Sequence, residues 1–259
     1  MLRIEHSGIS PRQFRFALQS HFDFTVTDSD KQPLFVVEFD GPGHSRPIQV
    51  RRDELKDQLC ELFQLPLLRI NSRYLETYRT MNLLSWFVEA WFGARAFADA
   101  QESGAIPYDE PFDPMWFISI PGRKGWFPMQ LGYEIRQKIR RLCNSGKCRD
   151  PSPSYFCGAD ARENYRIISY LRLNDETGVY ATSGMRCQQF DISPGEVLDE
   201  LVLFDLWSRI EEVLQGRGRP LPTADIYRVA REFQSKYEMR STGFCGRIGE
   251  GLLGPDPAA

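Results

Sequence analysis

The chain has 259 residues, of which 42% are hydrophobic and 13% aromatic, and this composition excludes a disordered protein and predicts a folded core. The net charge of −3 argues against a protein that coats nucleic acid non-specifically, although a local basic groove can bind phosphates within an acidic chain. No apolar run approaches the roughly twenty residues of a membrane helix, so we expect no membrane contact. The N-terminus lacks a signal-peptide pattern, and the six cysteines therefore indicate reduced thiols and a cytoplasmic location.

The N-terminal segment predicts a short strand. In residues 12–18 apolar side chains fall at every second position, which is the period that a strand requires. Residues 1–11 are interrupted by Gly8 and Pro11, so we expect no helix ahead of this strand.

Two further strands are expected next, joined as a hairpin. Residues 22–27 alternate apolar and polar side chains, and residues 28–33 are dense in turn formers, as in a strand that returns through a short turn. Residues 34–40 form the second strand, which is apolar on both faces for four residues and therefore predicts a central position in a sheet. This strand ends in Glu38 and Asp40, which lie about 7 Å apart on one face.

These two carboxylates need a partner, because an isolated buried charge is costly or becomes neutral. A divalent cation is one such partner, and Asp23 on the neighbouring strand supplies a third oxygen ligand if the hairpin register places it opposite Glu38. The alternative is that Asp23 or Asp40 caps a strand end or pairs with an arginine.

A charged helix is expected at residues 48–63, followed by a strand at residues 67–70. The apolar side chains that share one helical stripe, and that we expect to pack on the sheet, are Ile48, Leu55, Leu59, Leu62 and Phe63. The adjacent stripe, which can overhang the strand ends, contains Gln49, Arg52, Asp53 and Lys56. From this stripe Lys56 can bring an ammonium to the carboxylates and stabilise charge that develops on a phosphate; the alternative is an ordinary solvated lysine.

The order of these features resembles the PD-(D/E)XK nuclease superfamily. In its usual form an Asp begins one core strand and the next strand ends in Asp/Glu-x-Lys; here Asp23 and Glu38 match the two acids, and Asp40 occupies the lysine position. Several branches carry the lysine on the following helix, and Lys56 in Arg-Asp-x-x-Lys fits that migrated position. Over roughly residues 14–75 the chain most resembles an uncharacterised bacterial branch, whose pattern is Asp-Phe, Glu-x-Asp-Gly, a His, Arg-Asp-x-x-Lys and Pro-Leu-Leu-Arg-Ile.

The resemblance implies a restriction-endonuclease-like mixed central sheet flanked by helices. It also implies a Mg²⁺-dependent nuclease that cleaves DNA, with Mn²⁺ as a substitute and no organic cofactor. Asp23, Glu38 and the main-chain carbonyl of Phe39 would hold the metal, and Asp40 would be a further ligand or would hold Lys56. The residues expected to contact substrate are His44, Gln49 and Arg52.

An alternative function follows from two departures from the superfamily pattern. The usual core begins with a helix and a strand, of which this sequence offers only the strand at residues 12–18, and Asp40 stands where lysine usually does. Both departures favour a catalytically inactive nucleic-acid-binding or scaffold module that retains the fold.

The remaining sequence predicts a packing helix and a second, smaller α/β unit. Residues 76–101 carry a Trp/Phe stripe at helical spacing, and we expect this helix to complete a first domain that spans residues 1–104. Residues 105–215 form the expected accessory region, and residues 216–259 a helix, near residues 223–237, with a loose tail.

Within the accessory region the pattern predicts strands at residues 116–120, 165–173 and 178–181, and a helix at residues 196–214. The basic stretch at residues 136–149 is a candidate contact for nucleic-acid phosphates. The alternative is that its charges form an ordinary solvated helix face.

Overall fold

The computed structural model describes residues 8–41, 47–78, 81–117, 126–188, 190 and 192–243. The chain divides into two compact units. The first contains residues 1–114 and 188–192, and the second contains residues 115–187 and 193–259. Both combine helices with a sheet, so the fold is mixed α/β, and none of the helices within the described ranges is long and apolar enough to cross a membrane.

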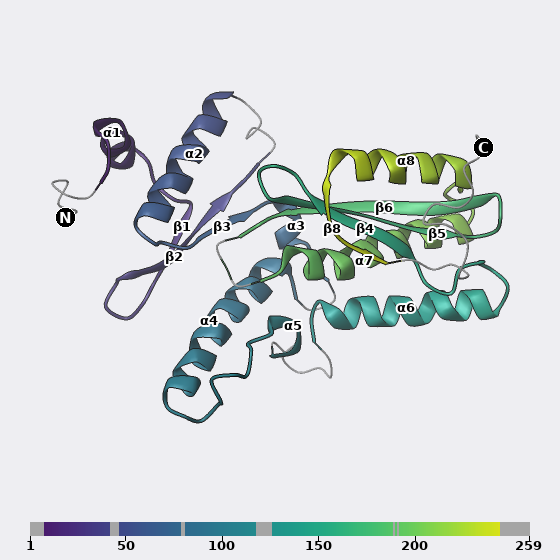
Figure 1. The fold of residues 1–259 in the computed structure, drawn as a ribbon, viewed down its shortest axis with the longest axis horizontal. Coiled ribbons are helices and arrows are strands. Elements are labelled where there is room, and N and C mark those ends of the chain that lie inside the picture. The colour runs from purple at the N-terminus through teal and green to yellow at the C-terminus, as the bar shows by residue number, and fades with distance from the viewer. Residues whose placement is uncertain are drawn as a thin grey trace. The chain divides into compact units, whose positions relative to one another are not determined.

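The first unit is built on a three-stranded sheet (Figure 1). Its elements in chain order are α1 (Pro11–Gln19), β1 (Phe24–Thr27), β2 (Pro33–Phe39), α2 (Pro47–Leu62), β3 (Leu67–Ile70), α3 (Ser72–Leu75) and α4 (Leu83–Glu102). The strand order is β1-β2-β3, with β1 antiparallel and β3 parallel to β2. The predicted central position of the apolar strand β2 is therefore confirmed.

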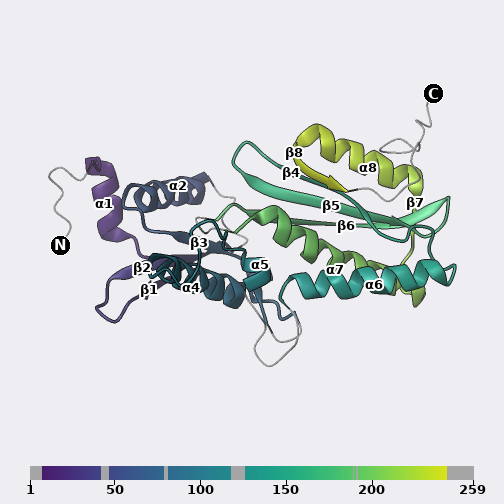
Figure 2. The same ribbon diagram turned by 60° about the horizontal axis from the view of Figure 1, so that its bottom comes forward.

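Helices cover both faces of this sheet, α2 on one side and α4 on the other (Figure 2). On the α4 side, Phe35 of β2 is fully buried and its ring lies 4.9 Å from that of Trp91 and 5.5 Å from that of Phe190. Phe190 belongs to the short segment that returns from the second unit. The aromatic stripe of α4 is thus core, as predicted, although the helix begins at Leu83 and not near residue 76.

The expected strand at residues 12–18 is wrong, because this segment forms the helix α1. Ser10 and Gln13 make a reciprocal capping box: Ser10 Oγ accepts the Gln13 main-chain N–H at 3.2 Å, and Gln13 Oε1 accepts that of Ser10 at 2.8 Å. Pro11 occupies the first turn, where its missing N–H costs nothing. The alternation that suggested a strand has no buried face, since Leu18 is 70% exposed.

The second unit is a five-stranded antiparallel sheet of order β7-β6-β5-β4-β8. Its strands are β4 (Ser154–Ala159), β5 (Asn164–Arg172), β6 (Thr177–Arg186), β7 (Leu221–Pro222) and β8 (Glu238–Gly243). Its helices are α6 (Met129–Asn144), α7 (Pro194–Leu214) and α8 (Thr223–Lys236), and the short α5 (Pro114–Phe117) lies at the division between the units. α8 packs on one face of the sheet, while α7 packs on the other face and is itself in contact with α6 (Figure 1).

Several predictions for this unit hold and three do not. The hairpin of β5 and β6 and the helices α7 and α8 are present near their expected positions. The strand expected at residues 116–120 is wrong for residues 116 and 117, which are helical, while residues 118–120 lie outside the described ranges. The division falls at residue 114 and not at 104, and residues 223–243 belong to the second unit because α8 and β8 complete its sheet.

Candidate active site

A pocket of about 170 Å³ lies in the first unit, between the ends of β1 and β2 and the helix α2. The residues that line it are Ser20, His21, Asp23, Glu38, Phe39, Gln49, Arg52 and Lys56. Six of these eight were candidate site residues from the sequence, and they come from segments up to thirty-three positions apart. No pattern in the sequence distinguished the other two, Ser20 and His21.

The hairpin register brings the two predicted acids together. Phe24 pairs with Val37, so Asp23 lies opposite Glu38 at the next position. The main-chain N–H of Asp23 donates to Glu38 Oε1 at 3.2 Å, and the N–H of Phe39 donates to Asp23 Oδ2 at 2.7 Å. Asp23 is exposed at the pocket mouth, whereas Glu38 is buried.

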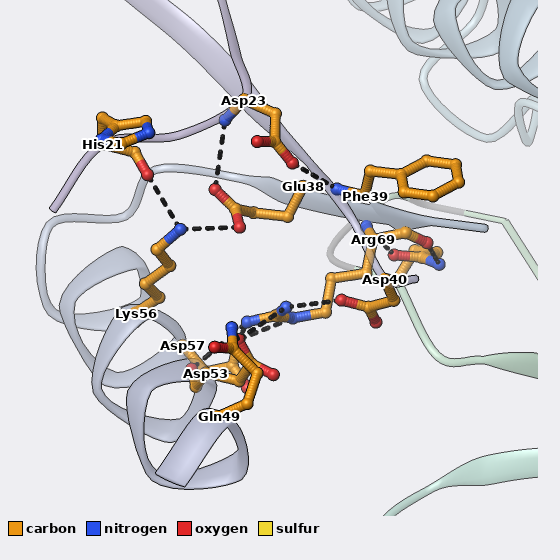
Figure 3. A network of polar contacts seen from close by, with 11 residues as sticks. His21, Asp23, Glu38, Phe39, Asp40, Gln49, Asp53, Lys56, Asp57 and Arg69 are labelled. Carbon is orange, nitrogen blue, oxygen red and sulfur yellow. Dashed lines mark hydrogen bonds and ion pairs between the residues drawn. The ribbon is translucent and has the colours of Figure 1, made fainter. Parts of the chain in front are cut away.

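Lys56 reaches this acid pair from α2 (Figure 3). Its Nζ lies 2.6 Å from Glu38 Oε2 and donates to the main-chain carbonyl of His21 at 2.8 Å. The Lys56 side chain is 12% exposed and that of Glu38 is 4% exposed. The alternative of an ordinary solvated lysine is therefore wrong, and Glu38 has a counter-charge within the protein.

Asp40 does not share this pocket. Its Oδ1 accepts from Arg69 Nη1 at 3.0 Å, which is the arginine pairing that the sequence left open as an alternative. Arg69, from β3, also donates from Nη2 to Asp57 Oδ1 at 2.6 Å and lies 3.7 Å from Asp53 Oδ1. Burial lowers the pKa of Arg69, but Asp57, Asp40 and Asp53 outweigh it and raise the pKa above its ordinary value.

The buried side of α2 is polar in its N-terminal half and apolar near its C-terminal end, so the expected apolar stripe is correct for Leu59 but not for Ile48 or Leu62. Ile48 is 78% exposed and Leu62 45% exposed, whereas Asp53 is buried together with Leu59 and Cys60. The reason lies on the strands: Glu38 and Arg69 both point toward α2 (Figure 3) and need opposite charges there. The helix supplies them with Lys56 and with Asp53 and Asp57.

The remaining candidates differ in how they are placed. Arg52 is exposed and lines the pocket. Gln49 also lines it and donates from Nε2 to Asp53 Oδ1 at 3.1 Å. His44 lies in residues 42–46, outside the described part of the chain.

Arg69 is a further residue of this region that sequence reasoning missed. A signal was available, because Arg69 interrupts the apolar strand Leu67–Ile70, and a guanidinium there needs carboxylates around it. Its main chain is also held: Gln188 Oε1 accepts the Arg69 N–H at 2.9 Å, and Gln188 Nε2 donates to the Arg69 carbonyl at 2.8 Å. Gln188 is 119 positions away, and no local pattern points to it.

Asp23 and Glu38 are the carboxylates available to a cation in the pocket. Within the described ranges there is no group of three or more His, Cys, Asp or Glu side chains that could hold a metal ion. A hard cation here would therefore take its other ligands from main-chain carbonyls, water and substrate oxygens.

Comparison with known proteins adds one match. Residues 10–83 match a family described as "Protein of unknown function (DUF2726)". The matched stretch runs from the cap of α1 to the first residue of α4 and includes every described residue of the pocket. No curated protein matches the chain, and no solved structure does.

Proposed function

We propose that the first unit is a metal-dependent phosphodiesterase that cleaves DNA, with a core of the PD-(D/E)XK type. One observation carries the proposal: two carboxylates and an amine from three different elements meet at one pocket, with Lys56 Nζ 2.6 Å from Glu38 Oε2. Asp23 lies opposite Glu38 because of the register between β1 and β2. Lys56 reaches Glu38 from the side of α2 that faces the sheet.

The donor chemistry of the pocket fits a divalent cation such as Mg²⁺ or Mn²⁺. Asp23 and Glu38, with the main-chain carbonyl of Phe39, would hold it. One oxygen of each carboxylate accepts a main-chain N–H, and an ionised carboxylate has further lone pairs to offer. When bound, such an ion lowers the pKa of a coordinated water and offsets charge on the attacked phosphate.

The other side chains of the pocket suit a phosphate substrate. Lys56 keeps its ammonium beside the acid pair, where it can stabilise negative charge that develops in the transition state. Arg52, exposed at the pocket, can bind a phosphate oxygen without reading base sequence. Gln49, from α2, and His21, from the segment after α1, add further polar groups to the lining of the pocket.

A nicking assay on supercoiled plasmid, with Mg²⁺ or Mn²⁺, tests the proposal. The wild-type chain should convert supercoiled to open-circular DNA, and EDTA should abolish the conversion. Glu38→Gln and Lys56→Met should each lower the rate by at least about 100-fold, as loss of transition-state stabilisation does. Glu61→Gln, an exposed position on the same helix, is the matched control and should cleave normally; activity that survives in Glu38→Gln refutes the assignment.

A second candidate is a nucleic-acid-binding module without turnover, and a specific observation favours it. Lys56 already neutralises Glu38, and Asp40 is held by Arg69, so the acids have partners without a metal. Binding of DNA with no cleavage, together with no calorimetric heat on titration with Mn²⁺, would support this candidate over the nuclease.

A further inference from the structure

The two halves of α2 are anchored to the sheet in different ways. Near its C-terminal end, Cys60 packs with Val36 and Leu67 in an apolar cluster. In the N-terminal half, among the side chains that the structure describes, Asp53 is the one that is buried. The fully described buried contact of this half is therefore ionic, and Lys56 lies between Asp53 and Cys60 along the helix.

Arg69 is the cation that makes this attachment (Figure 3). Its side chain is 5% exposed, and its guanidinium donates to the Asp57 carboxylate from Nε at 3.0 Å and from Nη2 at 2.6 Å. Nη2 also donates to the main-chain carbonyl of Asp53 at 3.2 Å, while Nη1 donates to Asp40 at the end of β2. One planar group thus ties β3 to the end of β2 and to two successive turns of α2.

These contacts flank Lys56 on the helix. Asp53 precedes it by three positions and Asp57 follows it by one, so fixing them fixes both the rotation of α2 and its height above the sheet. A guanidinium can do this because its donors form a rigid planar fork, whereas the ammonium of a lysine acts as a point charge.

We propose that Arg69 is a positioning residue, which holds α2 so that the Lys56 ammonium meets Glu38 at the pocket. Arg69 itself does not line the pocket. The catalytic meaning of this role rests on the proposed nuclease function, while the placement of Lys56 can be measured without it.

The test compares the chemical reactivity of Lys56 in three proteins. Reductive methylation of the full chain, followed by mass mapping, gives a rate for Lys56 relative to the exposed Lys31. The first variant is Arg69→Lys, which keeps the charge and loses the fork. The matched control is Arg172→Lys, which breaks a comparable partly buried arginine pair, with Asp150, in the second unit.

In the wild-type chain Lys56 should react slowly, because Glu38 and the His21 carbonyl hold its ammonium. Arg69→Lys should raise the Lys56 rate at least about tenfold, which corresponds to a contact weakened by about 1.4 kcal/mol, and Arg172→Lys should not change it. An unchanged Lys56 rate in a folded Arg69→Lys protein overturns the proposal. If that variant does not fold, Asp57→Asn decides, since Asp57 is 47% exposed; a raised Lys56 rate supports the proposal and an unchanged one overturns it.

The plasmid assay run on the same proteins separates the two hypotheses. Where the wild type cleaves DNA, Arg69→Lys should lower kcat by about 100-fold, as a small misplacement of a catalytic group does, with little change in KM. A change in KM alone, with kcat intact, contradicts the positioning role. Where the wild type does not cleave, the nuclease proposal fails, and the methylation rates still decide whether Arg69 positions Lys56.

Discussion

The ion pair between Lys56 and Glu38 predicts a large coupling in a double-mutant cycle. The variants are Lys56→Met, Glu38→Gln and the double substitution. The two side chains are 12% and 4% exposed and their charged atoms lie 2.6 Å apart. Removal of one partner from a buried pair leaves the other charge uncompensated and lowers the free energy of unfolding by about 3–5 kcal/mol. Since Lys56 keeps some contact with water, we take the lower end, about 3 kcal/mol for each single variant.

The double variant should recover much of this loss. It leaves no uncompensated charge, and the amide oxygen of the introduced glutamine can still accept the Asp23 N–H that Glu38 accepts at 3.2 Å, so we expect a coupling of at least about 2 kcal/mol. Urea unfolding monitored by hydrogen exchange of the β2 and α2 amides reports the stability of the first unit separately from that of the second. Single variants that each cost less than about 1 kcal/mol and add without coupling would match an exposed pair and refute the geometry on which the site depends.

Two further predictions concern other parts of the fold. Gln188→Met keeps the side-chain volume but removes the two hydrogen bonds, of 2.9 and 2.8 Å, to the main-chain N–H and carbonyl of Arg69. It should lower the free energy of unfolding by about 3 kcal/mol and speed hydrogen exchange in β3; unchanged exchange there contradicts the prediction. In the second unit, burial raises the pKa of Glu200 to about 7 from 4.5, Arg136 lowers it and Asp199 raises it. Because the folded state binds this proton more tightly than the unfolded chain, stability should fall by roughly 3 kcal/mol between pH 4.5 and pH 7, and Glu200→Gln should flatten the corresponding fall in Tm.

The sequence predicted the charged residues that line the pocket better than it predicted the secondary structure around them. Glu38 stood out because a carboxylate ends an apolar strand, and Asp23 followed from the alternation that sets the hairpin register. Such arguments need only strand periodicity and the cost of a buried charge. Asp40 met the same criterion, and here the pattern did not decide between metal and arginine, because the arginine lies 29 positions further along.

Local periodicity failed where a short-range signal of another kind was present. The alternation in residues 12–18 suggested a strand, but Ser10 and Gln13 at capping-box spacing, with Pro11 between them, start a helix. The predicted division at residue 104 was also misplaced, because the first unit continues to residue 114. No pattern in the sequence shows that residues 188–192 return to that unit.

The misjudged face of α2 has a more general cause. Assigning its apolar side chains to the core assumes that the surface beneath the helix is apolar, whereas this sheet presents Glu38 and Arg69 to it. Complementary charges must then come from the helix, and apolar residues such as Ile48 move to the exposed side. An arginine within an apolar strand is therefore informative from its position in the sequence alone: it predicts carboxylates on the element that covers it, and here it would have identified Asp53 and Asp57, the neighbours that hold Lys56 in place.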